Sequence, residues 1–355
     1  GANKTSGTGN VAIGHLTCLP TATGNTELVI GYGSNYWLRG DSSYNICTQG
    51  NMCATCFIGC ACGLTGLPAA GFPPDSQENL YAGTNAGAAS DADTCYNIAI
   101  GYKAACKNNS GDNNVFLGCC AGFCATTISD SVFIGSGAGR YVPAGTYNTF
   151  IGHSAGKSQT GITAICCNTF IGYYAGSEVC VGHSNTYLGV TAGYKRGAAC
   201  YSVAIGRHAL EGNSDLTCNT GNDNIAIGFQ AGQYVEDGSN SVYIGTQAGY
   251  NAKSACNNVY VGFCAGVSSQ SAKCNVFIGP WAGQYASSTV YCSIAIGVKA
   301  LHKSASSMCG NIAIGDVALG CATLGGDAVV IGRHAGEKLA CAGQSVFIGA
   351  YAGYG

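Results

Sequence analysis

Charge is the scarcest feature of this chain of 355 residues. Asp, Glu, Lys and Arg together make up 9% of the sequence, against about 25% in an ordinary soluble domain. The formal net charge of −2 leaves no basic footprint, which argues against binding to nucleic acid. No apolar run approaches the roughly 18 to 20 residues of a membrane span. A disordered chain is excluded as well, because 47% of the residues are hydrophobic.

Glycine and cysteine are abundant instead, with 56 and 23 residues, and one short motif recurs along the whole chain. The motif reads Asn or Ser, aliphatic, aromatic or Ala, aliphatic, Gly, two variable residues, Ala and usually Gly, as in NTFIGYYAG from Asn168. The glycine after the aliphatic residue, here named the motif glycine, recurs mostly at spacings of 17 or 18. Its copies are Gly14, Gly31, Gly59, Gly83, Gly101, Gly118, Gly135, Gly152, Gly172, Gly189, Gly206, Gly228, Gly245, Gly262, Gly279, Gly297, Gly315, Gly332 and Gly349.

A repeat of this length is typical of one coil of a β-solenoid. Apolar residues alternate before each motif glycine with the period of a strand. We therefore predict an all-β parallel β-solenoid (a β-roll) of about 19 coils, stacked at about 4.8 Å. It forms a single domain over 1–355. Irregular coils at 32–56 and 64–78 interrupt it, and we expect any recognition or junction surface there.

Each position of the repeat has an expected structural role. The aliphatic residues three and one before the motif glycine, such as Val115 and Leu117, are predicted to fill the interior of the coils. The Ala three after it marks a place too narrow for a larger side chain. The motif glycine itself is expected to have a positive φ or to let the neighbouring backbone approach. The Asn or Ser four before it is predicted to form hydrogen bonds from coil to coil.

The residue two before the motif glycine is predicted to point away from the interior, yet it is apolar in every copy. Such a stripe would be an aggregation hazard if it faced solvent, so we predict that it forms an interface between laterally associated copies of the chain. The aromatic members of this predicted interface are Phe57, Tyr81, Phe116, Phe133, Phe150, Phe170, Tyr187, Tyr243, Tyr260, Phe277 and Phe347.

The motif, written N-[ST]-x-[ILV]-G-x-x-A, resembles the head repeats of trimeric autotransporter adhesins and similar repeats of phage tail fibres. The resemblance covers the chain from Asn10 to Gly353. It implies a left-handed parallel β-roll, three chains per rod and an extracellular attachment role. The sequence departs from the adhesin pattern in its longer period, its many cysteines and the lack of a coiled-coil stalk or membrane anchor.

The cysteines are interpreted as disulfides, which would place the protein in an oxidising, extracellular compartment. Residues one period apart should lie above one another, within reach of a disulfide. The candidate pairs are Cys106 with Cys124, Cys200 with Cys218, Cys256 with Cys274, Cys292 with Cys309, and Cys321 with Cys341. The cluster Cys47, Cys53, Cys56, Cys60 and Cys62 has no readable connectivity, and a zinc site at its CxxC is disfavoured.

No catalytic set emerges from the sequence, so we expect a protein that is not an enzyme and that needs no cofactor. Arg207–His208 and Arg333–His334 share one register, which indicates a repeat position. The motif runs close to both ends, which predicts head-to-tail stacking into a filament; the alternative is that the 355 residues are a segment of a longer fibre protein. Asn3 and Asn108 lie in glycosylation sequons.

Together these features favour a structural, adhesive subunit of an extracellular fibre, with itself as partner and a cell-surface glycan or receptor as a further one. Exposed aromatics such as Tyr173 and Tyr174 fit either packing or stacking on sugars. The alternative function is a single-chain carbohydrate- or ice-binding solenoid. Ice binding would require a longer threonine column than Thr149, Thr169 and Thr186 provide.

Overall fold

The computed structural model describes residues 8–15, 17, 28–32, 35–40, 46–47, 74–158, 164–213, 219–285, 290–303, 308–322, 326–340 and 343–355. The chain divides into two compact units, 1–67 and 68–355, which are considered one at a time. The described residues contain β-strands and no helix, so the all-β class is confirmed. The prediction of one continuous domain stays a prediction.

The first unit begins with two strands in motif register. Strand β1 (Val11–Ile13) pairs in parallel with β2 (Leu28–Tyr32). β2 then pairs antiparallel with β3 (Asn35–Gly40), which pairs antiparallel with β4 (Ile46–Cys47). The parallel pattern therefore breaks within 32–56, one of the two segments expected to be irregular. The predicted coil at Gly59 lies outside the described residues.

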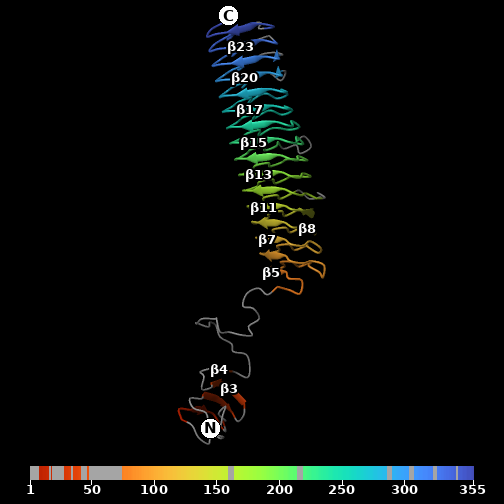
Figure 1. Cartoon of the computed structure of the whole chain (residues 1–355). Helices are drawn as coiled ribbons and strands as arrows, with labels where there is room; N and C mark the ends of the chain where they lie inside the picture. Colours follow the sequence, from red (N-terminus) through yellow and green to blue (C-terminus); the bar gives the residue numbers. More distant parts are fainter. Residues whose placement is uncertain are drawn as a thin grey trace. The chain divides into compact units, whose positions relative to one another are not determined.

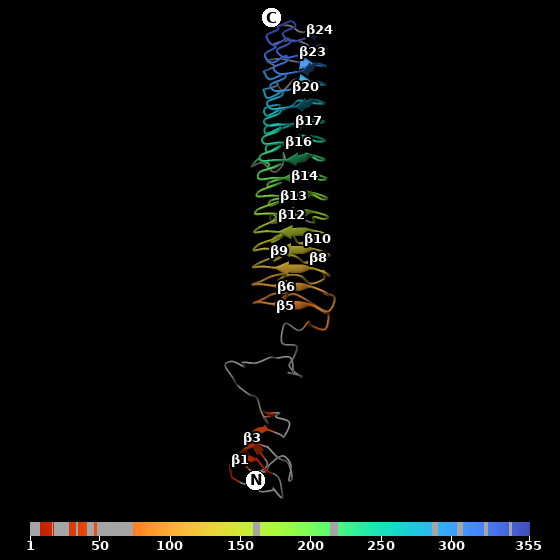
Figure 2. The same ribbon diagram turned by 60° about the vertical axis from the view of Figure 1, so that its left-hand side comes forward.

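The second unit is a parallel β-solenoid whose main sheet has sixteen strands, one for each coil from Gly83 to Gly349 (Figures 1 and 2). Two further parallel pairs, β8 (Thr127–Ser129) with β10 (Ala144–Thr146) and β19 (Val290–Tyr291) with β21 (Met308–Cys309), lie outside this sheet. The strands of the main sheet are β5 (Leu80–Ala82), β6 (Ile98–Ile100), β7 (Val115–Leu117), β9 (Val132–Ile134), β11 (Thr149–Ile151), β12 (Thr169–Ile171), β13 (Thr186–Leu188), β14 (Val203–Ile205), β15 (Ile225–Ile227), β16 (Val242–Ile244), β17 (Val259–Val261), β18 (Val276–Ile278), β20 (Ile294–Ile296), β22 (Ile312–Ile314), β23 (Val329–Ile331) and β24 (Val346–Ile348).

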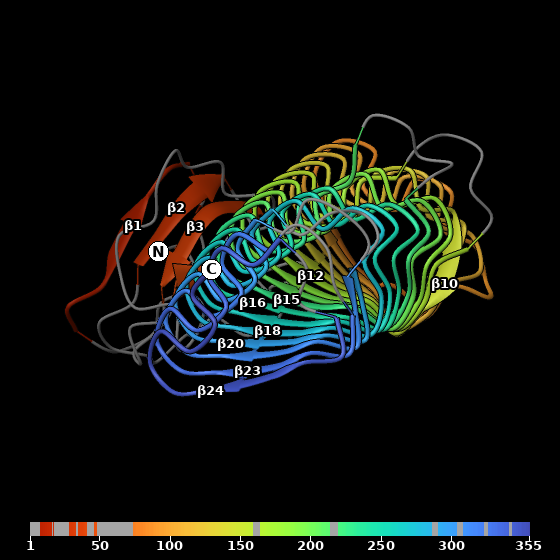
Figure 3. The same cartoon turned by 90° about the horizontal axis from the view of Figure 1, so that it is seen from above.

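The motif stays in register along this sheet, even where a repeat is longer than usual. Phe150 is opposite Phe170 across a spacing of 20, and Ala204 is opposite Ala226 across a spacing of 22. Equivalent positions of successive coils therefore form columns that run along the stack (Figure 3). The roughly 17-residue solenoid repeat is confirmed.

The column four before the motif glycine forms the predicted ladder of hydrogen bonds. Asn114 is 1% exposed, and both its backbone N–H and its side-chain amide donate to the side-chain oxygen of Asn97. The same amide also donates to the carbonyl of Ile128, and the side-chain oxygen of Asn114 accepts from the N–H of Ser131. The column thus satisfies buried backbone groups that no β-ladder reaches.

The motif glycine and the alanine column also match their predicted roles. In the sixteen coils the motif glycines have φ between +119° and +137°. A Cβ on Gly135 would lie 2.4 Å from the carbonyl oxygen of Gly152 in the next coil, so only glycine fits there. The alanine three positions later is fully buried in most coils, as at Ala121 and Ala231.

Two further columns hold the backbone in the left-handed region in each of these sixteen coils. We name them the turn column, two after the motif glycine, and the bend column, five before it. Lys103 and Trp281 in the turn column have φ of +53° and +57°, and Asn113 and Cys274 in the bend column have +59° and +58°. Apart from Gly137 and Gly310, both columns are occupied by residues other than glycine in these coils.

The interior of the coils is formed by the residue two before the motif glycine, here named the ring column. This reverses the prediction, which placed that residue outside and its two neighbours inside. The ring of Phe133 is 0% exposed and stacks on Phe150, with centroids 4.7 Å apart. Each ring lies over a glycine one turn along the same coil: a Cβ on Gly139 would approach the ring of Phe133 to 2.4 Å. Because glycine has no side chain, this position leaves room for the ring.

Candidate functional site

The residues predicted to form an interface between chains are buried within one chain. Eight of them have no exposed surface, so they are unable to contact a partner: Phe116, Phe133, Phe150, Phe170, Tyr187, Tyr243, Tyr260 and Phe277. Tyr81 and Phe347 occupy the first and last of the sixteen coils, where they are partly buried against the same core. Phe57 lies outside the described residues. The assignment of this column to an interface is therefore corrected.

The residues that do face outward are the ones expected inside: the aliphatic residues three and one before each motif glycine. We name their combined surface the flank face. It consists of the first and third residues of the sixteen strands of the main sheet. Ile227 and Ile278 are 37% and 38% exposed, and Leu188 is 44% exposed. The predicted interior pairs that lie on this face are Val115 with Leu117, Val132 with Ile134, Ile225 with Ile227, Val259 with Val261, and Ile312 with Ile314.

The flank face is long and carries no charge. Of its side chains, only Thr149, Thr169 and Thr186 are polar. At roughly 40 Å² of exposed apolar surface each, its aliphatic side chains present on the order of 1,000 Å². The largest apolar patch of a typical monomer covers about 300–600 Å², and a stable interface buries about 800 Å² of each partner. The flank face is therefore large enough for an assembly surface.

The cysteine pairs predicted from spacing are out of register by one position. Fifteen cysteines between Cys95 and Cys321 in the described part of the chain are free thiols; the side chain of Cys47 is not among those described. Cys124 stacks beside Lys107, whose ammonium lies 3.9 Å from its sulfur, and not beside Cys106. In the same way Cys256 is opposite Lys273 and Cys309 is opposite Tyr291.

These offsets correct three of the predicted pairs, those of Cys106 with Cys124, Cys256 with Cys274 and Cys292 with Cys309. These predictions were wrong because the spacing between the two cysteines of each pair differs by one residue from the length of the repeat in which they lie. Cys218 and Cys341 lie outside the described residues. The predicted pairs of Cys200 with Cys218 and of Cys321 with Cys341 therefore stay predictions. The cluster Cys53, Cys56, Cys60 and Cys62 also lies outside them.

One pair that the spacing argument missed is in register. Lys273 is opposite Tyr291, so the next residues, Cys274 and Cys292, both in the bend column, stack on each other. Both are exposed. Side chains of this column do meet between coils, since the amide of Asn113 donates to the carboxylate of Asp130 over 3.2 Å.

The predicted glycosylation site at Asn108 is inaccessible. Its side chain is 0% exposed and forms hydrogen bonds with both backbone groups of Gly111. An oligosaccharide on that amide would break a buried turn, so this prediction is corrected. Asn3 lies outside the described residues.

The histidines recur as structural pairs. His208 and His334 occupy the turn column, and each contacts a glutamate three residues later: the Nδ1 atom of His208 lies 2.6 Å from Glu211, and that of His334 lies 2.5 Å from Glu337. This repeats one local arrangement in two coils. Among the described residues, no group of three or more His, Cys, Asp or Glu side chains is arranged to hold a metal ion.

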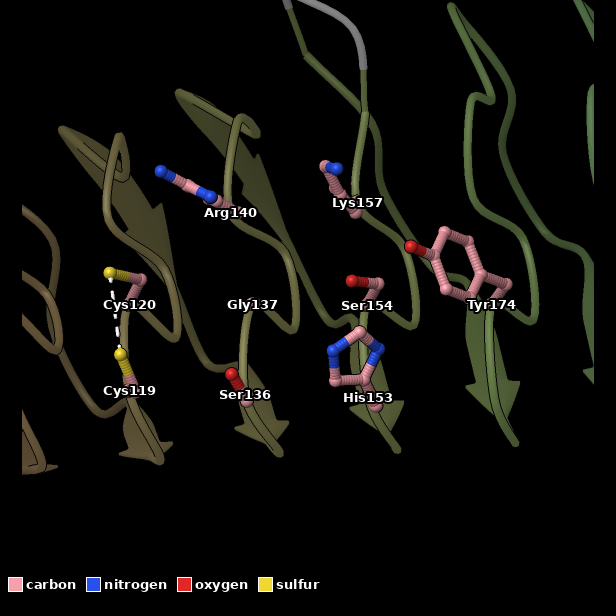
Figure 4. A pocket seen from close by; sticks show the side chains of 9 residues that line it. All are labelled: Cys119, Cys120, Ser136, Gly137, Arg140, His153, Ser154, Lys157 and Tyr174. Atoms are coloured by element: carbon pink, nitrogen blue, oxygen red, sulfur yellow. Dashed lines mark hydrogen bonds between the residues drawn. The ribbon is translucent and has the colours of Figure 1, made fainter.

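A shallow basic hollow, here named the notch, lies on the turn side of β7, β9, β11 and β12. It has a volume of about 180 Å³ and is lined by Cys119, Cys120, Ser136, Gly137, Arg140, His153, Ser154, Lys157 and Tyr174. Figure 4 shows three rows of residues across successive coils, with Arg140 and Lys157 extending over the same side. Gly137 opens the hollow, since it lies where the neighbouring coils carry Cys120 and Ser154. The sulfur atoms of Cys119 and Cys120 are 3.7 Å apart.

Comparison with protein-family models, curated proteins and solved structures finds no match for this chain. The fold and the surfaces described above are therefore the basis for any function. The part of the chain that the structure describes has no helix that is long and apolar enough to cross a membrane.

Proposed function

We propose that this chain is a non-catalytic structural subunit of an extracellular fibre, which associates side by side through the flank face. The observation that carries the proposal is the uncharged aliphatic surface along all sixteen strands of the main sheet. Covering about 1,000 Å² of apolar surface is worth on the order of 25 kcal/mol before the costs of association. Lost translational and rotational freedom, side-chain ordering and desolvation offset much of this gross figure, which is therefore an upper bound.

A second copy of the chain is the occupant that this face fits best. Its side chains repeat at the strand spacing of about 4.8 Å, so two such faces have ridges and grooves of the same period. The face presents no charge to repel its copy, and its only polar side chains are the three threonines. A partner of another kind would need a matching flat aliphatic surface of the same length.

The number of chains, the handedness and the biological setting belong to the same proposal. Three chains, a left-handed β-roll, an extracellular location and an adhesive role follow the resemblance of the repeat motif. End-to-end stacking stays a prediction from the sequence. Ice binding gains no support, because the outer face of the main sheet is aliphatic outside its three threonines.

The test places charge on the flank face without touching the core. The face variant Ile227→Lys/Val261→Lys/Ile296→Lys adds one lysine to alternate coils. The matched control Phe229→Lys/Phe263→Lys/Val298→Lys alters the same coils two residues further on, at apolar side chains that are 40–45% exposed. Mass is measured by light scattering after size exclusion, and folding by circular dichroism.

We expect the wild type and the control to form oligomers and the folded face variant to be monomeric. Light scattering counts the chains directly. A wild type that stays monomeric at micromolar concentrations would overturn the proposal and favour a single-chain ligand-binding solenoid. An equally associated face variant would overturn the flank face as the interface.

A further inference from the structure

The notch contains two cations that form no ion pair with any carboxylate of the described residues. Arg140 and Lys157 occupy equivalent positions of successive coils and line the same hollow. The ion pairs among the described residues involve His208, Lys253 and His334, and neither of these two cations. The stretch 159–163 that follows Lys157 reads QTGIT, which has no acidic residue.

Aromatic rings hold further cations beside the notch. The ring of Phe123 has the ammonium of Lys107 at 5.2 Å, that of Lys103 at 5.8 Å and the guanidinium of Arg140 at 6.0 Å. The ring of Tyr141 has Arg140 at 5.1 Å and Lys157 at 5.9 Å. Cation–π contacts of this kind orient the charges while leaving their N–H groups free for a ligand.

The two carboxylates of residues 101–157 form hydrogen bonds with other groups. Asp112 and Asp130 are the acidic residues between Gly101 and Lys157. Both lie in the bends that precede the strands, where Asp112 accepts from the N–H of Cys95 and Asp130 from the side chain of Asn113. Glu178 lies in the next coil, where its N–H donates to the carbonyl of Lys157 and its carboxylate accepts from the hydroxyl of Tyr194. In a chain with only 15 Lys and Arg, four cations without an ion pair among the described residues are a marked concentration of charge.

The other side of the notch offers rings and hydroxyl groups. His153 stacks on Tyr173 with centroids 5.4 Å apart, and Tyr173 meets Tyr174 at 4.5 Å. Tyr173 lies beside the notch, next to its lining residues His153 and Tyr174, and is 52% exposed. Ser136, Ser154 and Tyr174 bring hydroxyl groups to the hollow. An exposed ring beside hydroxyls suits the apolar face and the polar edge of a sugar.

We propose that the notch binds an acidic glycan, with Arg140 and Lys157 on a sulfate or carboxylate group and Tyr173 against the sugar ring. Arginine suits such planar or tetrahedral oxyanions because its N–H groups form paired, charge-assisted hydrogen bonds. The coil spacing is close to the length of one sugar unit, so Lys103 and Lys107 lie where a longer chain would continue. This inference does not rest on lateral assembly.

The experiment is calorimetric titration of the full chain with oligosaccharides of equal length. The probes are a heparin tetrasaccharide (sulfate and carboxylate), a hyaluronan tetrasaccharide (carboxylate alone), a neutral chito-tetrasaccharide and inorganic sulfate. The notch variant is Arg140→Gln/Lys157→Gln. The control Lys273→Gln/Lys338→Gln makes the same change of net charge elsewhere. The flank-face variant is titrated too, so that failure of assembly and failure of binding are separated.

We expect a charged tetrasaccharide to bind and the neutral one not to bind. The notch variant should lose roughly tenfold or more in affinity, as expected for a lost charge-assisted hydrogen bond, and the control should keep its affinity. Binding should weaken between about 50 and 200 mM salt. Tyr173→Ala should weaken binding of the glycan but not of inorganic sulfate.

Heparin binding alone assigns the site to sulfate esters, and binding of both charged probes assigns it to either oxyanion on a sugar. Equal binding by the wild type and the notch variant would overturn the proposal, and so would the absence of binding at millimolar probe. A single-stranded oligonucleotide of equal charge that bound as tightly, unaffected by Tyr173→Ala, would also overturn it. That result would indicate an unspecific polyanion surface.

Discussion

The interior of the solenoid should accept an exchange of volume between two columns. Where the ring column is aromatic, the residue six later in the chain is glycine, as in Phe133 with Gly139. Where it is Ala in the second unit, that residue is Leu in three of five coils, and both side chains of those three pairs are fully buried. The three natural Ala–Leu pairs are Ala204 with Leu210, Ala295 with Leu301, and Ala313 with Leu319. We predict that Phe133→Ala/Gly139→Leu is much more stable than its parts suggest.

The magnitudes follow from the contacts. Phe133→Ala removes a fully buried ring, which costs about 3–5 kcal/mol. Gly139→Leu alone drives a side chain into that ring, since its Cβ would already lie 2.4 Å away, at about 1–3 kcal/mol or more. In the double variant the leucine fills the space that the ring leaves. About 2 kcal/mol should remain, from the left-handed backbone and the lost ring stacking.

The backbone at this position supports the exchange. Gly139 has φ of +58°, and Leu210, Leu301 and Leu319 have +47° to +52° in the equivalent turn. The leucine therefore needs no backbone rearrangement.

Thermal unfolding followed by circular dichroism measures the ranking, and hydrogen–deuterium exchange over 127–158 shows whether the effect is local. We expect a favourable coupling of about 2 kcal/mol or more between the two substitutions. As a control, Phe133→Ala is combined with Gly122→Leu, which faces Phe116 in the preceding coil and should not rescue. A double variant as unstable as the sum of its parts would refute this account of the core.

Three further predictions concern other columns. Asn114→Ala should lower the melting temperature, costing about 2–4 kcal/mol because it leaves several buried backbone groups unpaired, whereas Asn114→Ser should cost less because serine occupies this column elsewhere. Burial raises the pKa of Tyr187 to about 12 and that of Tyr260 above its usual range of 10. The contribution of these tyrosines to stability should therefore be constant below pH 10 and fall as the pH rises towards 12, where the unfolded chain releases protons that the folded one keeps. Ultraviolet titration of tyrosinate checks this, and Tyr260→Phe should move the alkaline transition upward. Oxidised glutathione should convert Cys274 and Cys292 to a disulfide while being reduced to two thiols, and peptide mass spectrometry would instead show a different pairing if the bend column were misassigned.

The sequence predicted the repeat, the strand positions, the asparagine ladder and the role of the motif glycine. These features recur in almost every copy, so exceptions in single copies do not obscure them. It failed on which side of each strand is inside. Both sides are apolar, and period-two alternation alone does not distinguish them.

A signal that would have settled the side was present in the sequence. Rings pair with glycine six residues later, and Ala pairs with Leu, which is the volume compensation expected between two side chains that share one interior. The cysteine error has a related cause. A shift of one residue between spacing and local period moves a side chain to a different column, so a near match in spacing carries no structural information. The notch escaped prediction because Arg140 and Lys157 become neighbours only through the stacking of coils.

The two left-handed columns have a consequence for how the chain folds. A residue other than glycine in that backbone region costs of order 1–3 kcal/mol, and each coil contains at least one such residue. Hydrogen bonds to neighbouring coils offset this strain. The N–H of Cys120 in the turn column donates to the carbonyl of Tyr102 in the preceding coil, and the N–H of Asn113 in the bend column donates to the carbonyl of Cys95. An isolated coil would bear the strain without these bonds. No single repeat is therefore a folding unit, and a stable nucleus requires several consecutive coils to form together before growth along the stack becomes downhill.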